Sequence, residues 1–120
     1  MEIRICGEDE RKVAVLGSEG LVIKDVQGAL DFMSLLFYEY GCSKAVILKS
    51  NLPEEFFDLR TRLAGEILQK FTNYHFRLAV VGDFSGYTGK SLRDFIYESN
   101  KARQILFVSS EQEALELLKD

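Results

Sequence analysis

Two apolar runs decide the fold of this chain: Ala45-Val46-Ile47-Leu48 and Leu78-Ala79-Val80-Val81. A strand with one face in water alternates apolar and polar residues, whereas a parallel strand between two helix layers is apolar on both faces. The runs therefore predict two buried strands, over residues 44–49 and 76–82. We expect these strands to lie side by side inside one sheet, with helices covering both faces.

The segments on either side of these strands complete an α/β pattern. Turn and strand patterns predict a hairpin over residues 3–6 and 12–16. Capping residues and helical periodicity predict a helix from Asp25 to Gly41, a second helix ending near Asn73 and a third over 91–100. A strand over 104–108 follows, and the capping box Ser110-x-x-Glu113 opens the last helix. Parallel strands need helical crossovers. The fold class is therefore α/β, with an open, mostly parallel sheet, an antiparallel edge hairpin, and helices on the sheet faces.

Length and composition indicate a single domain over residues 1–120. Apolar residues make up 47% and charged residues 28% of the sequence, a balance typical of globular proteins. The net charge is -4 and the basic residues are scattered, so we expect no nucleic-acid partner. The amino-terminal residues run into the charged segment 8–12, which predicts a cytoplasmic protein with no signal peptide and no membrane association.

The cysteines and the single histidine argue against metal and catalytic sites. Cys6 and Cys42 lack a C-x-x-C spacing, which favours two buried thiols. His75 is the only histidine, which excludes a zinc site built on several imidazoles. It stands at the start of a predicted strand, at the opposite end from the candidate loops, so it cannot serve there as the base of a Ser-His-Asp triad. The sequence favours a non-enzymatic protein with no cofactor and no metal.

Candidate binding residues follow the predicted strands. In open α/β sheets, ligands and partners meet the loops beyond the carboxyl ends of the strands. The hydroxyl, amide and charged residues at these positions are Ser50, Asn51, Asp58, Thr61, Asp83, Ser85, Lys90 and Ser91.

The loop Gly86-Tyr87-Thr88-Gly89-Lys90-Ser91 ends in the residues of a phosphate-binding loop. In such a loop the backbone amides and the lysine hold phosphate, and the serine holds magnesium. Here the first required glycine falls on Phe84, and Ser109 follows the last strand where an aspartate is expected. The preferred interpretation is a loop in which Gly89 or Ser91 caps the third helix, and phosphate or nucleotide binding is the alternative.

Two segments carry a resemblance to a known family: residues 55–71, followed by Asn73 and Tyr74, and residues 92–100. Through them the chain resembles a bacterial family known as domain of unknown function 4180. The resemblance extends from the first helix to the last, and it implies no particular activity.

The order of elements also resembles that of the STAS domain of bacterial anti-sigma factor antagonists. In that domain an Asp-Ser pair at a helix start carries a phosphorylated serine. Asp58 stands at the position of that aspartate, Leu59 at that of the serine, and Thr61 is the nearest hydroxyl. The resemblance implies a regulatory module that binds another protein, and we expect the surface around residues 51–61 and 83–91 to do so.

Overall fold

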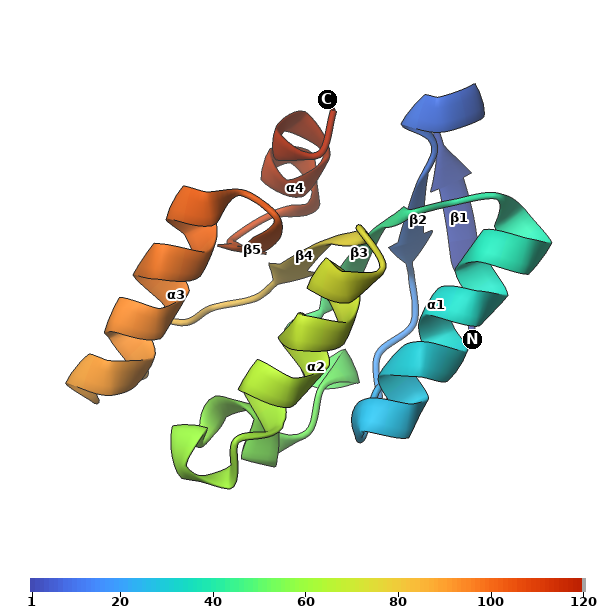
Figure 1. Cartoon of the computed structure of the whole chain (residues 1–120). Helices are drawn as coiled ribbons and strands as arrows, with labels where there is room; N and C mark the ends of the chain where they lie inside the picture. Colours follow the sequence, from blue (N-terminus) through green and yellow to red (C-terminus); the bar gives the residue numbers. More distant parts are fainter. Residues whose placement is uncertain (120) are drawn as a thin grey trace.

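The sheet of this protein keeps its strands in chain order, β1-β2-β3-β4-β5 (Figure 1). The computed structural model describes residues 1–119. Its strands are β1 (Ile3–Cys6), β2 (Val13–Leu16), β3 (Lys44–Leu48), β4 (Arg77–Val81) and β5 (Ile105–Val108), and its α-helices are α1 (Val26–Tyr40), α2 (Leu63–Asn73), α3 (Lys90–Ala102) and α4 (Glu111–Leu117). A short 3-10 helix, Asp9–Arg11, lies in the β1–β2 hairpin.

The pairing of the strands confirms the predicted fold class. β1 is antiparallel to β2, and β2 to β5 run parallel to one another. β3 lies between β2 and β4, and Ile47 pairs with Val80 in its register. Both side chains are completely buried, as the two apolar runs predicted.

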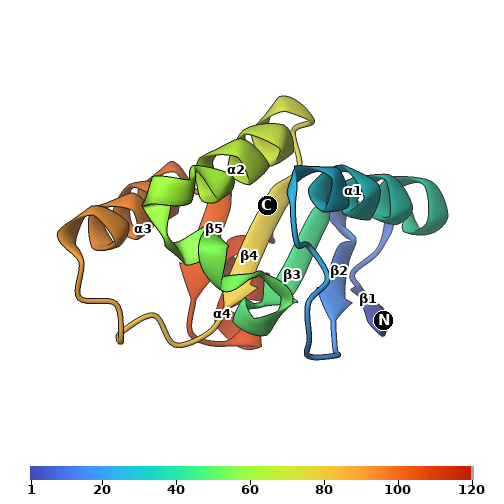
Figure 2. The same cartoon turned by 90° about the horizontal axis from the view of Figure 1, so that it is seen from below.

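The four helices divide unequally between the two faces of the sheet. Figure 2 shows α1, α2 and α3 on one side and α4 on the other. Because each crossover moves the chain by one strand in the same direction, crossovers of one hand place their three helices on the same face. α4 follows the last strand and covers the opposite face. Both faces are covered, but three helices share one of them.

The carboxyl end of α4 is held by two basic residues from the starts of neighbouring strands. Lys44 is buried, and its Nζ donates a hydrogen bond of 2.7 Å to the carbonyl oxygen of Leu118. Arg77 donates one of 3.0 Å to the carbonyl oxygen of Leu117. Positive charge at a helix carboxyl end complements the helix dipole and satisfies carbonyls that have no partner within the helix.

The predicted ends of α1 and the predicted end of α2 are confirmed, whereas α3 (Lys90–Ala102) is longer than the predicted 91–100. The Asp25 carboxylate accepts a hydrogen bond of 2.7 Å from the Gly28 N–H, and Gly41 ends α1 with a φ of 67°. The Ser110 hydroxyl accepts a hydrogen bond of 3.1 Å from the Glu113 N–H. The Glu113 carboxylate accepts a hydrogen bond from the N–H of Ser109, whereas in a capping box it would accept one from Ser110. The second hydrogen bond of the predicted capping box is therefore made one residue earlier in the chain.

Both cysteines are free thiols, but they differ in burial. Cys42 is buried, and the loss of water raises the pKa of its thiol. Cys6 on β1 is only half-buried, so the sequence overestimated its burial. No helix within residues 1–119 is long and apolar enough to cross a membrane.

A carboxylate in the middle of the sheet is expected to unfold the protein. Ile47→Asp or Val80→Asp would bury a charge with no partner, at a cost of several kcal/mol against a typical domain stability of about 5–15 kcal/mol. Leu21→Asp is the matched control, because Leu21 is 56% exposed. Thermal unfolding measures the effect. An unchanged melting temperature for Ile47→Asp would contradict the burial of both sheet faces.

Candidate functional site

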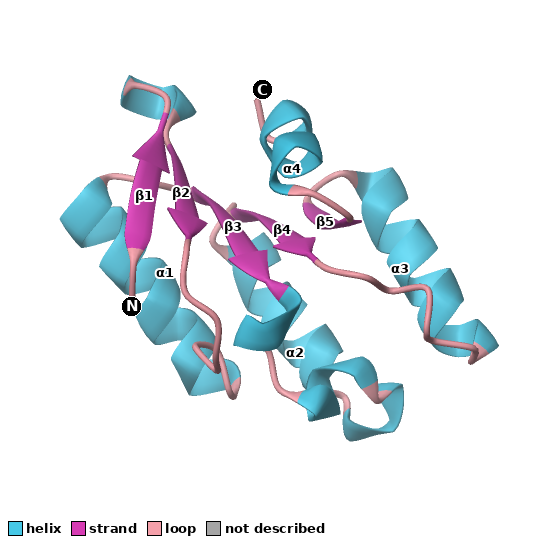
Figure 3. Cartoon of the chain, turned by 180° about the vertical axis from the view of Figure 1, so that it is seen from behind, coloured by secondary structure: helices cyan, strands magenta, loops and turns pink. Residues whose placement is uncertain are grey.

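Three connections meet at the carboxyl edge of the parallel strands, and together we call them the carboxyl-edge surface. They are residues 17–25 after β2, 49–62 after β3, and 82–89 after β4, all at the same end of the sheet (Figure 3). Connections in α/β units usually span about 2–6 residues. The connection over 49–62 is much longer, and three 3-10 helices order it: Lys49–Asn51, Glu54–Phe57 and Leu59–Thr61.

Asn51 fastens the first connection to the second. Its side chain is 0% exposed, and the amide nitrogen donates hydrogen bonds to the carbonyl oxygens of Ser18 (3.0 Å) and Gly20 (2.7 Å). Its side-chain oxygen accepts a hydrogen bond of 2.7 Å from the Leu48 N–H. Its main-chain oxygen accepts two more, of 3.0 Å each, from the first connection. Asn51 was a binding candidate in the sequence, and in the structure its side chain is a buried cross-link.

Lys49 fastens the second connection to the third. Its Nζ donates a hydrogen bond of 3.1 Å to the carbonyl oxygen of Asp83. The same ammonium lies 4.6 Å from the ring centroid of Tyr87, 5.7 Å from that of Phe84 and 5.8 Å from that of Phe57. A cation within about 6 Å of an aromatic face is attracted by the ring electrons. Aromatic rings from two connections therefore surround the Lys49 ammonium group.

The close packing at Lys49 depends on Gly82 and on a ring stack. A Cβ atom on Gly82 would lie 2.6 Å from the Cβ of Lys49, so a larger residue at position 82 would displace the lysine. The rings of Phe57 and Tyr87 stack with centroids 5.3 Å apart and planes inclined by 15°. Offset stacking of this kind stabilises the contact beyond the area it buries.

Asp58 and Thr61 order the end of the second connection. The side chain of Arg60 donates two hydrogen bonds of 3.0 Å to Asp58, and together with the Arg60 N–H it lowers the pKa of that carboxyl. The Thr61 hydroxyl lies 2.7 Å and 2.8 Å from the carbonyl oxygens of Glu55 and Asp58, and it accepts a hydrogen bond from the N–H that opens α2. Thr61 therefore links two 3-10 helices to the start of α2.

The third connection holds its polar residues in local pairs. The Ser85 hydroxyl donates a hydrogen bond of 2.6 Å to Asp83 and lowers the pKa of that carboxyl. Lys90 forms an ion pair of 2.7 Å with Asp94 one turn along α3, which raises the pKa of Lys90. Gly89 caps α3 without a side-chain hydrogen bond, as the preferred interpretation expected, and Ser91 is exposed in the first turn.

The arrangement brings some of the predicted residues together and leaves others apart. Asp83 and Ser85 pair with each other, Asn51 reaches the first connection, and Lys90 pairs with Asp94 on its own helix. Sequence reasoning did not select Lys49 and Tyr87, which organise the surface together with Phe57. Their only signal in the sequence was their position, a lysine directly after a strand and a tyrosine in a loop rich in glycine.

The surface lacks the groups of a common catalytic or metal site. The Asp83–Ser85 pair has no histidine beside it, because His75 lies in the turn before β4, at the opposite end of the strand. Within residues 1–119, no three side chains of histidine, cysteine, aspartate or glutamate are grouped closely enough to hold a metal ion. The geometry is that of an ordered surface of polar and aromatic side chains.

Removing the Asn51 cross-link is expected to destabilise the fold. Asn51→Ala leaves two carbonyl oxygens and one N–H without their side-chain partner, and we expect a loss of about 3 kcal/mol, since each unsatisfied buried group costs about 1–3 kcal/mol. Ser50→Ala, at the exposed neighbouring position, is expected to stay within about 0.5 kcal/mol of wild type. Urea unfolding measures both. Equal stability of the two variants would exclude this role for Asn51.

Removing the Lys49 charge is expected to loosen the third connection only. In Lys49→Met we expect the amides of Ser85 and Tyr87 to exchange with solvent about tenfold faster, because a cation–π contact is worth about 0.5–2 kcal/mol. Lys24→Met, an exposed lysine on the first connection, is the matched control. Hydrogen exchange by NMR measures these amides individually. Unchanged exchange in Lys49→Met would show that the connection is ordered without the lysine.

Comparison with known proteins assigns a family to this structure. The family described as Domain of unknown function (DUF4180) matches residues 8–118. Searches of curated proteins and of solved structures found no match. Since the family match covers almost the entire chain, this protein belongs to the DUF4180 family.

Proposed function

We propose that this protein is a non-enzymatic regulatory module that binds another protein through its carboxyl-edge surface, in the cytoplasm of a bacterial cell. The observation that carries the proposal is the double cross-link at the end of β3. Asn51 joins the connection over 17–25 to that over 49–62, and Lys49 joins the latter to 82–89. Three connections that could each move separately are thereby held as one surface.

Preassembly of a surface favours tight recognition. Binding by mobile loops loses conformational entropy when the loops become ordered, and a surface that is already ordered avoids this cost. The long 49–62 connection contains little regular α or β structure, yet its 3-10 helices are held by Asn51, by Thr61 and by the Asp58–Arg60 pair. Long ordered connections of this kind are usually functional.

The charge on the surface indicates the chemistry of the partner. Glu19 and Glu54 line a hollow beside Lys49, and Glu55 and Asp83 are exposed nearby. Apart from the Asp58–Arg60 ion pair, the three connections carry five acidic residues, Glu19, Asp25, Glu54, Glu55 and Asp83, and three basic ones, Lys24, Lys49 and Arg62. The surface therefore has a net acidic excess. We infer that the partner presents basic side chains, because complementary charge increases association rate and specificity.

The resemblance to the STAS domain supports a regulatory role. In this proposal the segment from Asp58 to Thr61 corresponds to the regulatory segment of that domain. A phosphate on Thr61 would remove the hydroxyl donor that bonds to Glu55 or Asp58, and it would add negative charge at the start of α2. Phosphorylation would therefore rearrange the 49–62 connection. Intact-mass measurement of protein from its native cells tests for it.

Phosphate or nucleotide binding at Gly86 to Ser91 has less support. The Lys90 ammonium, which would bind phosphate, is paired with Asp94. The Asp83 carboxylate beside this loop adds a negative charge that repels a phosphate group. Millimolar ATP or GTP with magnesium is therefore expected to leave the melting temperature unchanged. A rise of several degrees would favour this alternative.

Affinity capture from the native cells tests protein binding. We expect wild-type protein to retain a stoichiometric partner, and Glu19→Lys/Glu54→Lys to lose it, because the reversed charge repels a basic surface. The control Glu10→Lys/Glu39→Lys makes the same change in net charge at exposed positions outside the carboxyl-edge surface. It should retain the partner.

Two results would count against the proposal. One is recovery of the same partner by both double variants, which would place the interface elsewhere. The other is the absence of any stoichiometric partner of the wild-type protein under several growth conditions.

A further inference from the structure

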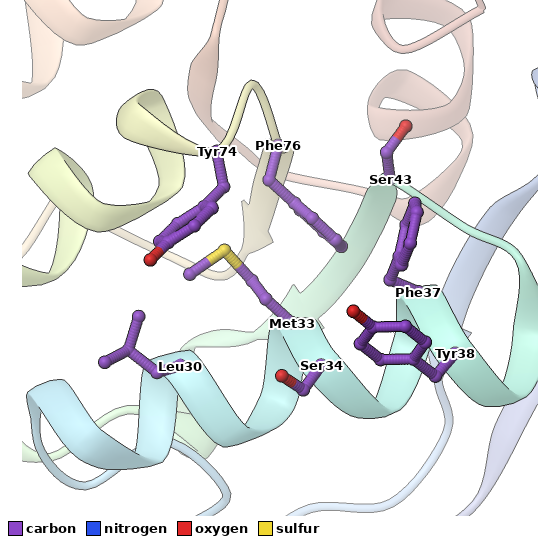
Figure 4. A pocket seen from close by; sticks show the side chains of 8 residues that line it. All are labelled: Leu30, Met33, Ser34, Phe37, Tyr38, Ser43, Tyr74 and Phe76. Carbon is purple, nitrogen blue, oxygen red and sulfur yellow. The ribbon is translucent and has the colours of Figure 1, made fainter.

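A second hollow lies between α1 and the turn that joins α2 to β4, where Ser43 and Phe76 precede β3 and β4. It has a volume of about 410 Å³. Figure 4 shows its lining, with the Tyr74 ring at one end beside Met33 and the Phe37 and Tyr38 rings at the other. The full lining is Leu30, Met33, Ser34, Phe37, Tyr38, Ser43, Tyr74 and Phe76.

The floor of the hollow belongs to the protein core. Met33 and Phe76 are both buried, and Phe76 packs edge-to-face against the buried Phe71, with ring centroids 5.6 Å apart. Core packing holds these side chains whether or not the hollow is filled. The site is therefore formed in advance, as most small-molecule sites are.

The rim gathers the exposed aromatic side chains of the protein. Phe37 is 58% exposed, Tyr38 80% and Tyr74 64%. Among residues 1–119, the remaining aromatic side chain with comparable exposure is Tyr97, on α3. Phe37 and Tyr38 support one another edge-to-face, at 5.1 Å and 86°. Exposed rings clustered around one apolar hollow indicate a ligand that covers them.

The lining determines what kind of ligand fits. None of its side chains is charged, so an ion entering the hollow would lose hydration without gaining a counter-charge. The aromatic rings and the Met33 thioether favour a flat aromatic ring, since sulfur and ring edges attract one another. The hydroxyls of Ser34, Ser43, Tyr38 and Tyr74 offer hydrogen bonds to a hydroxyl or carbonyl group.

We propose that this hollow, which we call the aromatic pocket, binds a small uncharged molecule with one or two aromatic rings and a hydroxyl or carbonyl group. Its size suits such a molecule, because ligand pockets usually measure about 300–1,000 Å³. Rings close it at both ends, which leaves little room for an extended peptide. This inference is independent of the proposed protein-binding surface, and the two have no lining residue in common.

The methionines of the chain allow a direct test with 1-naphthol as the probe. The chain has two methionines: Met33 lies in the floor of the pocket, and Met1 is 63% exposed outside it. With ¹³C-methyl-methionine labelling, 1-naphthol is expected to shift the Met33 signal saturably and to leave the Met1 signal in place. The charged analogue 1-naphthoate is expected to bind at least tenfold more weakly.

Three variants show whether the pocket itself is responsible. Ser34→Phe places a ring in the hollow from an exposed helix position, and Tyr38→Ala removes one wall with little effect on folding. We expect each to weaken 1-naphthol binding at least tenfold. Tyr97→Ala removes a ring that is 65% exposed and lies outside the pocket, and this variant should bind as wild type.

Several outcomes would overturn the proposal. They are a linear shift of both methionine signals, equal binding of 1-naphthoate, and unchanged binding in Tyr38→Ala. A concentration-dependent dimer that Tyr38→Ala abolishes would also overturn it, because a second copy of the chain would then cover the rings.

Discussion

The parallel pairing of β2, β3, β4 and β5 in chain order is the constraint on which the rest of this structure depends. Each of these four strands starts at the same end of the sheet, so every connection that follows one of them begins at the opposite, carboxyl edge. The crossovers all advance in one direction, which places α1, α2 and α3 on one face. The opposite face is left to α4, and the buried Lys44 holds the end of that helix.

The carboxyl edge is ordered by residues that stand immediately after β3. Lys49 and Asn51 are separated by one residue, yet they reach in opposite directions to the neighbouring connections. This is possible because β3 is central, with β2 on one side and β4 on the other. A residue that follows the outermost strand of a sheet has a neighbouring connection on one side only. The centre of the sheet is therefore the natural place for a cross-link between three loops.

The two candidate binding regions differ in chemistry because they are built from different parts of the fold. The carboxyl-edge surface consists of connections, which carry polar, charged and aromatic residues, with more acidic than basic side chains. The aromatic pocket is built mainly from the side of α1 and the end of α2, where apolar residues of the core continue to the surface. We therefore propose a charged macromolecule as the partner of one region and an uncharged small molecule as the ligand of the other.

The sequence by itself determined the elements, their order and the fold class, because these depend on local patterns. Unbroken apolar runs indicated the central strands, and Asp25 and Gly41 bounded α1 through hydrogen bonds and backbone angles within a few residues. The roles of the site residues depended on the tertiary structure. An asparagine after a strand has the same sequence signature whether it faces solvent or, like Asn51, is buried under another loop. The rings around Lys49 come from residues 57, 84 and 87, and Met33 meets Tyr74 and Phe76 only because α1 packs beside α2. Contacts between residues so distant in the chain follow from packing, which no local pattern encodes.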